Sequence, residues 1–152
     1  MIRVRQAVIE DATLIGDRLR DADRVEAWRA MGLFAHAAIR ESILKSSVCG
    51  VFLDDNEPLC IMGLVQPIIL APGIAHPWLV GTEALGHHRK AFLRETRLWV
   101  QEWRKDYSLL VNYVDAEYTG AIRWLEWLGF DIFPPEPYGP RGALFRRFEM
   151  RS

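Results

Sequence analysis

The sequence has little that would span a membrane, hold a metal or cross-link the chain. Of its 152 residues only Cys49 and Cys60 are cysteines. Both stand in apolar runs, whereas metal sites need closer clusters that include histidine or more cysteine. We expect two buried free thiols, as a reducing cytoplasm would keep them, with a Cys49–Cys60 disulfide as the alternative. No window approaches about 18 uninterrupted apolar residues, and no apolar core follows the basic start, so neither a membrane span nor an export signal is expected.

The chain also lacks an excess of either charge. Its 19 basic and 20 acidic side chains give a formal net charge of −1, which provides no overall attraction for nucleic acid or anionic lipid. Basic and acidic residues are interleaved along residues 89–105, which argues against a nucleic-acid-binding helix there. Half of the residues are hydrophobic, and no repeat, linker or low-complexity tract interrupts them. The sequence predicts one cytoplasmic domain over residues 1–152.

The N-terminal part combines a short strand with helical periodicity. Arg3–Val8 predicts a strand, and residues 10–19 predict a helix that begins with an acidic pair. From Asp23 to Lys45 the apolar positions recur with a helical period. Gly32 interrupts that period and predicts a break between two helices.

A hairpin is expected next. The runs Val48–Leu53 and Leu59–Ile69 flank a polar turn at residues 54–58, the pattern of two antiparallel strands. Gly50 and Gly63 lie inside these runs, where a glycine marks a bulge or a close approach of the backbone.

The C-terminal half alternates strands with helices. Residues 70–77 and 134–140 are rich in proline or glycine and predict irregular segments, and Gly129 is placed to end a helix. Strand, helix, strand, helix and strand are expected, in that order, at Trp78–Thr82, 89–105, Leu109–Val114, Ala121–Leu128 and Ala143–Met150. An antiparallel meander followed by this alternation predicts an α/β (α+β) sandwich, a mixed central sheet with helices on both faces.

The segment EYTGAIRWLEWLGF, from Glu117 to Phe130, resembles the last conserved segment of the GNAT superfamily of N-acyltransferases. It has a small residue, Ile, two spacers and Leu, and it ends on Leu-Gly-Phe. The opening IRVRQAVIEDA is similar to the family's first strand and helix, so the resemblance covers almost the whole chain. It implies a sheet with a splayed parallel pair, and transfer of an acetyl group from acetyl-CoA to an amine.

A narrower resemblance is to the GNAT-like internal virion protein A group of short-tailed phages. There too a strand bearing tryptophan leads through a polar turn to a basic helix, and then to a strand ending in Asn-Tyr-Val, here Asn112–Val114. A helix ending in glycine and an aromatic residue follows, here Gly129 and Phe130. This subgroup would make the protein virion-associated, with a phage or host protein as its partner.

The resemblance implies a cofactor site at the end of the strand Trp78–Thr82 and in the loop after it. Backbone N–H groups near Val80, Gly81 and Thr82 would polarise the acyl carbonyl. The family's loop carries an Arg or Gln and two closely spaced glycines, whereas this loop has one glycine and a basic cluster. Basic residues oppose the dipole of a helix N-terminus unless an anion offsets them, which favours a phosphate site over a solvated terminus. The loop residues expected to bind are Leu85, Gly86, His87, His88, Arg89 and Lys90.

The same resemblance exposes a departure at the catalytic acid. If Gly129 and Phe130 are aligned on the family's Gly-Phe, Leu125 occupies the place of the tyrosine that protonates the departing thiolate. Leucine has no proton to donate. Tyr118 stands where the family has an asparagine, and it is the candidate for a displaced acid.

A general base is less clearly marked. Glu26, Glu83 and Asp115 are the carboxylates nearest the expected cleft, and Glu26 is our candidate. His36 and His76 do not have metal-ligand spacing, so packing or capping is the better interpretation and no metal is expected.

Two functions therefore compete. The first is an acetyl-CoA-dependent N-acetyltransferase that acts on an unidentified small-molecule or protein amine. The second is a catalytically degenerate GNAT-like protein that serves in binding or virion assembly, which Leu125 and the missing glycine favour. Trp124 and Trp127 cannot both share the buried stripe of their helix, so part of this aromatic surface is expected to face a partner or a second copy.

Overall fold

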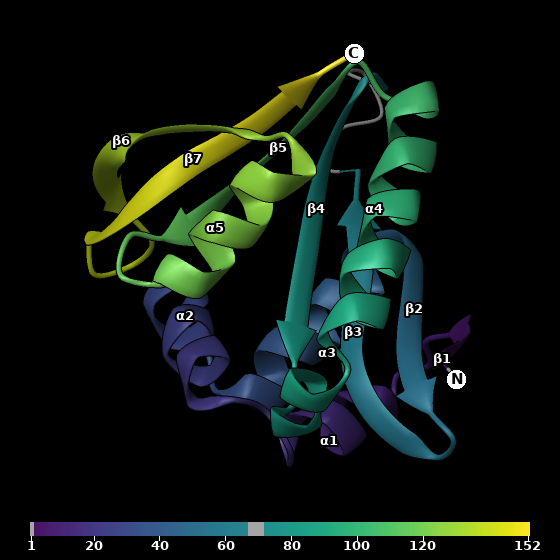
Figure 1. Ribbon diagram of the computed structural model, residues 1–152. Helices are drawn as coiled ribbons and strands as arrows, with labels where there is room; N and C mark the ends of the chain where they lie inside the picture. Colours follow the sequence, from purple (N-terminus) through teal and green to yellow (C-terminus); the bar gives the residue numbers. More distant parts are fainter. Residues whose placement is uncertain (1, 67–71) are drawn as a thin grey trace.

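The computed structural model describes residues 2–66 and 72–152, and within them the strands form a seven-stranded sheet in the order β1-β2-β3-β4-β5-β7-β6 (Figure 1). Neighbouring strands are antiparallel except β4 and β5, which are parallel. The predicted mixed sheet is confirmed. The strands are β1 (Ile2–Gln6), β2 (Ser46–Asp54), β3 (Glu57–Val65), β4 (Ile74–Gly81), β5 (Leu109–Asp115), β6 (Asp131–Tyr138) and β7 (Ala143–Arg151).

The hairpin of β2 and β3 is confirmed, and its two glycines have a packing role. A Cβ on Gly50 would lie 2.5 Å from the Trp99 ring, and one on Gly63 would lie 2.6 Å from Nε1 of Trp78. The glycines thus let two indole rings lie against the sheet backbone, while the register shifts of the hairpin fall elsewhere, between Ser46 and Val48 and between Phe52 and Leu53. Residues 67–69 of the predicted second strand lie outside the described residues.

The irregular segment predicted at residues 70–77 is wrong at its end, because β4 already begins at Ile74. The Pro77 carbonyl accepts a hydrogen bond from Nδ2 of Asn112 on β5, so the backbone groups of Pro77 lie on the edge of β4 that faces β5. Residue pairing between the two strands ends at Ala75 and Leu110. A proline nitrogen that faces this unpaired edge removes no bond from the sheet.

The turn predicted at residues 134–140 is also wrong over most of its length, because β6 runs to Tyr138. β6 is the last strand in the sheet order and pairs only with β7. Proline is tolerated on such an edge, where one side of the backbone has no partner strand. A register shift between Ile132 and Pro135 accommodates the first of the prolines.

The predicted helices are confirmed with small shifts at their ends. Gly32 and Gly129 each follow a helix with positive φ angles of 68° and 106°, the conformation in which glycine ends a helix. The α-helices are α1 (Asp11–Gly16), α2 (Asp21–Met31), α3 (Ala35–Lys45), α4 (Arg89–Asp106) and α5 (Thr119–Leu128), and a 3-10 helix, η1 (Glu83–His87), lies between β4 and α4.

The helices cover two faces of the sheet, each over its own apolar cluster. α4 and α5 lie on the face that carries Leu79, Leu110 and Val114, while α1 and α3 lie on the face that carries Trp78 and Val80 (Figure 1). Alternate residues of β4 thus contribute to opposite faces, as strand geometry requires. No helix among the described residues is long and apolar enough to cross a membrane.

The cysteines agree with the sequence-based prediction in part, and the tryptophans of α4 agree with it. Cys49 and Cys60 are free thiols, but only Cys60 is buried, because Cys49 is half-buried. On α4, Trp103 is buried and the Trp99 ring packs at a tilt against Phe52, so this helix lies on the sheet as expected. No group of three or more metal-binding side chains occurs among the described residues.

Candidate active site

The site begins where β4 and β5 separate. The two strands pair only at Ile74–Leu109 and Ala75–Leu110, and beyond these pairs their carboxyl ends point apart (Figure 1). Two side chains bridge the start of the gap. Nδ1 of His76 donates to the Val111 carbonyl at 2.6 Å, and Nδ2 of Asn112 donates to the Pro77 carbonyl at 2.9 Å. The gap is therefore a defined opening in the sheet and not a frayed end.

The β4 backbone presents one N–H group to this gap. The Thr82 N–H donates to the Leu59 carbonyl of β3 at 2.9 Å, so the N–H of its neighbour Gly81 points away from β3, and it donates to Asp23 at 2.9 Å. Backbone groups two residues apart point the same way along a strand. The Leu79 N–H, between Pro77 and Gly81, consequently faces the gap at a level where β5 no longer pairs with β4.

This geometry moves the backbone donor that the sequence had placed near Val80, Gly81 and Thr82. The N–H groups of Gly81 and Thr82 already have partners, and Val80 faces β3, where it is in register with Ile61. Leu79, which the sequence gave no reason to single out, is the residue of β4 whose N–H can meet a ligand in the gap.

Helix α2 places two carboxylates over the separated strand ends. Asp23 accepts from the Gly81 N–H at the end of β4, and Oε2 of Glu26 accepts from the Asp115 N–H at the end of β5, at 3.0 Å. Residues three apart share a helix face, so one turn of α2 reaches both strands. Arg20 pairs with Asp23 at 2.8 Å, which balances that buried charge. The i, i+3 spacing of the two acids was visible in the sequence, but their strand partners were not.

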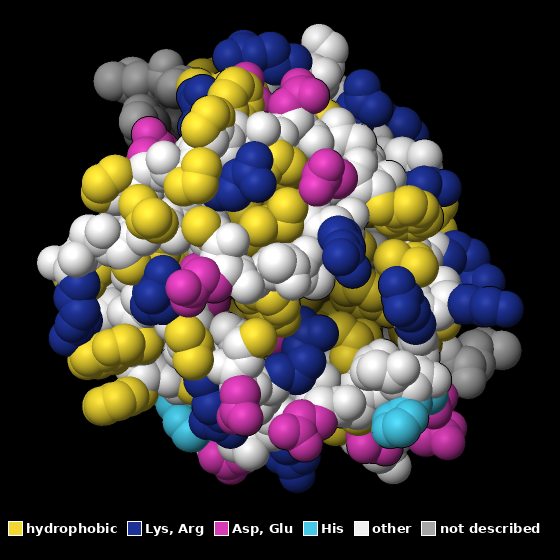
Figure 2. All heavy atoms as spheres, turned by 60° about the vertical axis from the view of Figure 1, so that its left-hand side comes forward, with side chains coloured by type: hydrophobic (Ala, Val, Ile, Leu, Met, Phe, Trp, Pro, Cys, Tyr) yellow, Lys and Arg dark blue, Asp and Glu magenta, His cyan; other side chains and the backbone are white. Residues whose placement is uncertain are grey.

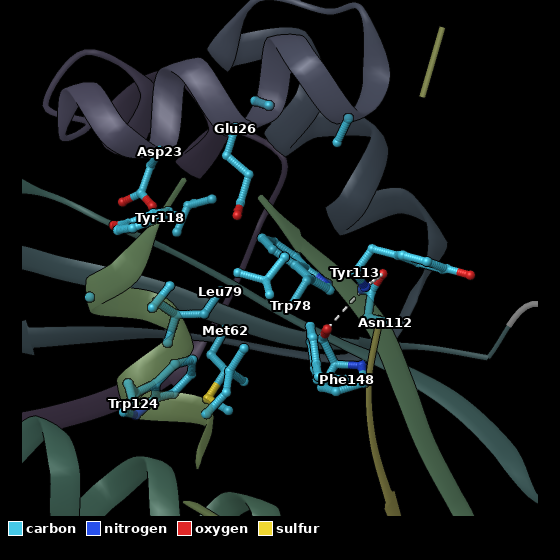
Figure 3. Close-up of a pocket in the computed structure, with 18 of the residues that line it drawn as sticks. Asp23, Glu26, Met62, Trp78, Leu79, Asn112, Tyr113, Tyr118, Trp124 and Phe148 are labelled. Carbon is cyan, nitrogen blue, oxygen red and sulfur yellow. Dashed lines mark hydrogen bonds between the residues drawn. The ribbon is translucent and has the colours of Figure 1, made fainter. Parts of the chain in front are cut away.

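Burial and charge make Glu26 an unusual acid. Desolvation, with added repulsion from Asp23 and Asp115, raises the pKa of its carboxyl to about 8, although the Asp115 N–H opposes this shift. Its side chain projects from α2 toward Trp78 inside the cavity (Figure 3). A carboxyl with a pKa near 8 can accept a proton at neutral to mildly alkaline pH, as a general base must.

The other two carboxylates that the sequence suggested are placed differently. Asp115 uses one oxygen on Arg29 at 2.6 Å and the other on the Glu117 N–H at 3.0 Å, so it is occupied in structural contacts. Glu83 is exposed in η1 and does not line the cavity. Glu26 is the one of the three that borders the cavity.

The phenol of Tyr118 lies beside Asp23, at the same end of the gap (Figure 3). Desolvation first, and then the charge and hydrogen bond of Asp23, raise the pKa of Tyr118. Tyr118 therefore keeps its proton through the neutral range. Leu125, by contrast, is 5% exposed and packs in the core against the cavity wall, so the structure places an apolar side chain where the family resemblance expected an acid.

A cavity of about 1200 Å³ lies at the gap and is lined by residues from both faces of the sheet. Its wall is mainly apolar, with Met62, Leu79 and Trp124 on the side of α5 (Figure 3). Figure 2 shows a hollow with an apolar floor and Lys and Arg side chains around its rim. The basic residues that border the cavity are Arg20, Lys45, Arg89 and Arg123.

The loop predicted to bind the cofactor forms η1 and the first turn of α4. Leu85, Gly86 and Arg89 border the cavity, and a Cβ on Gly86 would meet nothing within 4 Å. His88 is half-buried with Nε2 3.5 Å from Asp54, and His87 and Lys90 are exposed outside the cavity wall. The open glycine, the first N–H groups of α4 and Arg89 together suit an anion such as a phosphate.

Solved structures with the same overall fold include acetyltransferases. An N-acetyltransferase from Staphylococcus aureus Mu50 superposes with a TM-score of 0.73 at 17% identity, over 99% of this chain and 98% of that one. The GNAT-family acetyltransferase from Streptococcus pneumoniae gives 0.64 at 14% identity, over 100% of both chains. The yncA protein from Salmonella typhimurium, solved with its cofactor acetyl-CoA, gives 0.69 at 12% identity, over 99% and 94%. No family model and no curated protein matches the sequence.

Proposed function

We propose that this chain, which has the GNAT fold, is an acyl-CoA-dependent N-acyltransferase that moves an acetyl group from acetyl-CoA to an amine. One observation carries the proposal. The gap between β4 and β5 presents the Leu79 N–H on one strand and has Glu26 over the end of the other. A preorganised N–H donor and a base of matched pKa are what acyl transfer to an amine requires.

The residues that would hold the donor lie on the face of α4 and α5. Met62, Leu79 and Trp124 form an apolar wall for a thioester chain, while Gly86 leaves open space for a phosphate and Arg89 supplies a cation. Acetyl-CoA supplies the thioester carbonyl that an amine attacks. The Leu79 N–H would donate to the carbonyl oxygen as negative charge develops there.

Glu26 and Tyr118 would move the protons. Glu26 takes one proton from the substrate ammonium, which leaves a nitrogen lone pair to attack the carbonyl carbon. The new C–N bond forms, the C–S bond breaks, and the electron pair leaves on sulfur. Tyr118 gives its proton to that thiolate and recovers one from Glu26 or from solvent. The attacking nitrogen still carries one extra proton when the C–S bond breaks, and it releases that proton to solvent, so the products are the amide, the free thiol and one solvent proton.

A second candidate is a GNAT-like protein that retains the fold for binding without catalysis, as in the phage group. Leu125 is the observation that favours it, because the family's acid position is buried and apolar. In support of a partner surface, Trp127 is 42% exposed beneath Arg97. Cytoplasmic location, a single domain over residues 1–152, virion association and an oligomer or protein partner remain predictions.

The cofactor assignment is tested by changing Arg89 and Lys90 together to Ala. We expect the Kd for acetyl-CoA, measured by calorimetry, to rise about tenfold, because each lost charge-assisted contact to phosphate weakens binding. Arg104 and Lys105, exposed at the other end of α4, provide the matched double variant, which should bind as the wild type does. An unchanged Kd in the first variant would reject the loop assignment, and no binding by the wild type would reject the proposed function.

Tyr118→Phe tests the acid. We expect kcat for amine acetylation to fall about 100-fold, the scale of a lost proton donor, while the Kd for acetyl-CoA stays the same. Tyr107→Phe is the control, because Tyr107 does not line the cavity and its hydroxyl donates to Oε1 of Gln66 at 3.4 Å. If kcat falls less than threefold in Tyr118→Phe, Tyr118 is not the acid, and the thiolate takes its proton from solvent.

A further inference from the structure

The cavity has a second half, on the face of α2 and α3, which the acetyl donor does not need. We call it the acceptor arm. Strand alternation sends Trp78 and Tyr113 to this face, because Leu79, Leu110 and Val114 pack on the other one. Six residues define the arm, namely Ala30, Ala38, Ile39, Trp78, Val111 and Tyr113.

The arm is shaped by small residues opposite large ones. Its helical wall has only the methyl groups of Ala30 and Ala38 at two of its positions, which leaves room in front of the Trp78 and Tyr113 rings. Tyr113 is fixed by stacking on Tyr138 at 4.2 Å between ring centroids, and the Trp78 indole lies over Gly63. An apolar slot with a rigid aromatic wall is suited to a flat apolar ligand.

The polar side chains along the arm are already used within the protein. Oγ of Ser42 donates to the Ala38 carbonyl at 2.9 Å, and Nε1 of Trp78 donates to Oγ of Ser46 at 2.8 Å. Nδ1 of His76 is bound to the Val111 carbonyl. A ligand with several hydroxyl or amino groups would leave those groups unpaired against this wall, which lowers its affinity.

The charges place the amine at one end. Glu26 reaches into the cavity beside Trp78 (Figure 3), where its Oε2 accepts from the Asp115 N–H. At the far end of α3, Lys45 borders the cavity with its side chain 64% exposed, and its Nζ lies 3.5 Å from Oε2 of Glu41. The reacting end thus has the acidic side chain of Glu26, while Glu41 at the other end is paired with Lys45, an arrangement that favours a ligand with one amino group over a polyamine.

We infer that the acceptor is a primary amine carried on an apolar body of about the size of an aromatic ring, with its amino group at Glu26 and its body against Trp78 and Tyr113. The inference rests on the proposed function for the identity of the reacting end. The apolar body of the acceptor is inferred from the residues that line the acceptor arm.

The test compares phenethylamine, ethylamine and spermidine as acceptors with acetyl-CoA. We expect kcat/KM for phenethylamine to exceed that for each of the other two by at least tenfold. Ala30→Leu places a larger side chain in the arm and should lower the ratio of phenethylamine to ethylamine at least tenfold. Ala22→Leu, exposed on the same helix, is the matched control and should keep the wild-type ratio.

Binding of phenethylamine, measured by ligand-observed NMR without any acetyl donor, tests the acceptor arm separately from acetyl transfer. Binding that weakens at least tenfold in Ala30→Leu and not in Ala22→Leu supports the arm even if turnover is absent. Spermidine as the preferred acceptor would overturn the inference and leave acetyl transfer standing. Acetyl-CoA binding without any binding of phenethylamine would also overturn it, whereas failure to bind acetyl-CoA counts against the proposed function alone.

Discussion

Replacement of Glu26 by Gln is expected to lower kcat/KM for amine acetylation by about 100- to 10,000-fold at pH 8, the range for a lost general base. The amide keeps the size of the side chain and can still accept from the Asp115 N–H, so the strand end stays capped. Only the capacity to take a proton is removed. Glu83→Gln, at the exposed carboxylate of η1, is the control and should retain full activity.

The pH profile tests the same residue. Because the pKa of Glu26 is raised to about 8, its carboxyl is mostly protonated below that pH, and wild-type kcat/KM should rise through pH 8 as the base ionises. Glu26→Gln should retain only the rise that belongs to the substrate amine, near pH 10. A Glu26→Gln profile that keeps the step near pH 8 would assign the base to another group.

The raised pKa also has a consequence for folding. The folded protein holds a proton on Glu26 that the unfolded chain releases above its ordinary value near 4.5. Stability should therefore fall as pH rises from about 5 to 8, and Glu26→Gln should lose less stability over that interval than the wild type. Thermal unfolding midpoints at the two pH values check this without any substrate.

Leu79→Pro is expected to lower kcat by about 100- to 1,000-fold, the usual effect of losing one donor to a developing oxyanion. Proline removes the N–H that faces the gap, and at this position the missing group costs no bond in the sheet, as Pro77 already shows. The Leu79→Ala variant keeps the N–H while it shortens the side chain, so it separates loss of the donor from loss of packing.

Two results together would confirm this role. Leu79→Ala should keep most of the wild-type kcat, and Leu79→Pro should retain the circular dichroism of the folded protein with its activity lost. Equal kcat in the two variants would mean that the backbone of residue 79 does not touch the reacting carbonyl.

Sequence periodicity was sufficient for most of the fold. Gly32 and Gly129 ended helices where the pattern stopped, and the hairpin of β2 and β3 followed from two apolar runs around a polar turn. The errors at Pro77 and in β6 have one cause. Proline signals a break in a regular strand, but it is tolerated at an edge or beside a gap, and sheet order is a tertiary property.

The site was harder to predict because its key groups are defined by partners. Glu26 was suggested by proximity alone, and its raised pKa depends on desolvation first and then on repulsion from Asp23, one turn away on α2, and from Asp115 at the end of β5. The side chain of Leu79 does not indicate its role. That role follows from which N–H groups of β4 point toward β3 and which point away, and from the position at which β5 stops pairing with β4. Because the donor is a backbone N–H, the residue type at position 79 does not reveal it.

If the Leu79 N–H in the gap meets the acyl donor, its amide resonance in ¹⁵N-labelled protein reports the contact directly. On titration with acetyl-CoA, we expect a saturable shift of the Leu79 amide as its N–H gains an acceptor, among the largest shifts along β4. Saturable shifts confined to other residues, with the Leu79 amide unmoved at full occupancy, would contradict it.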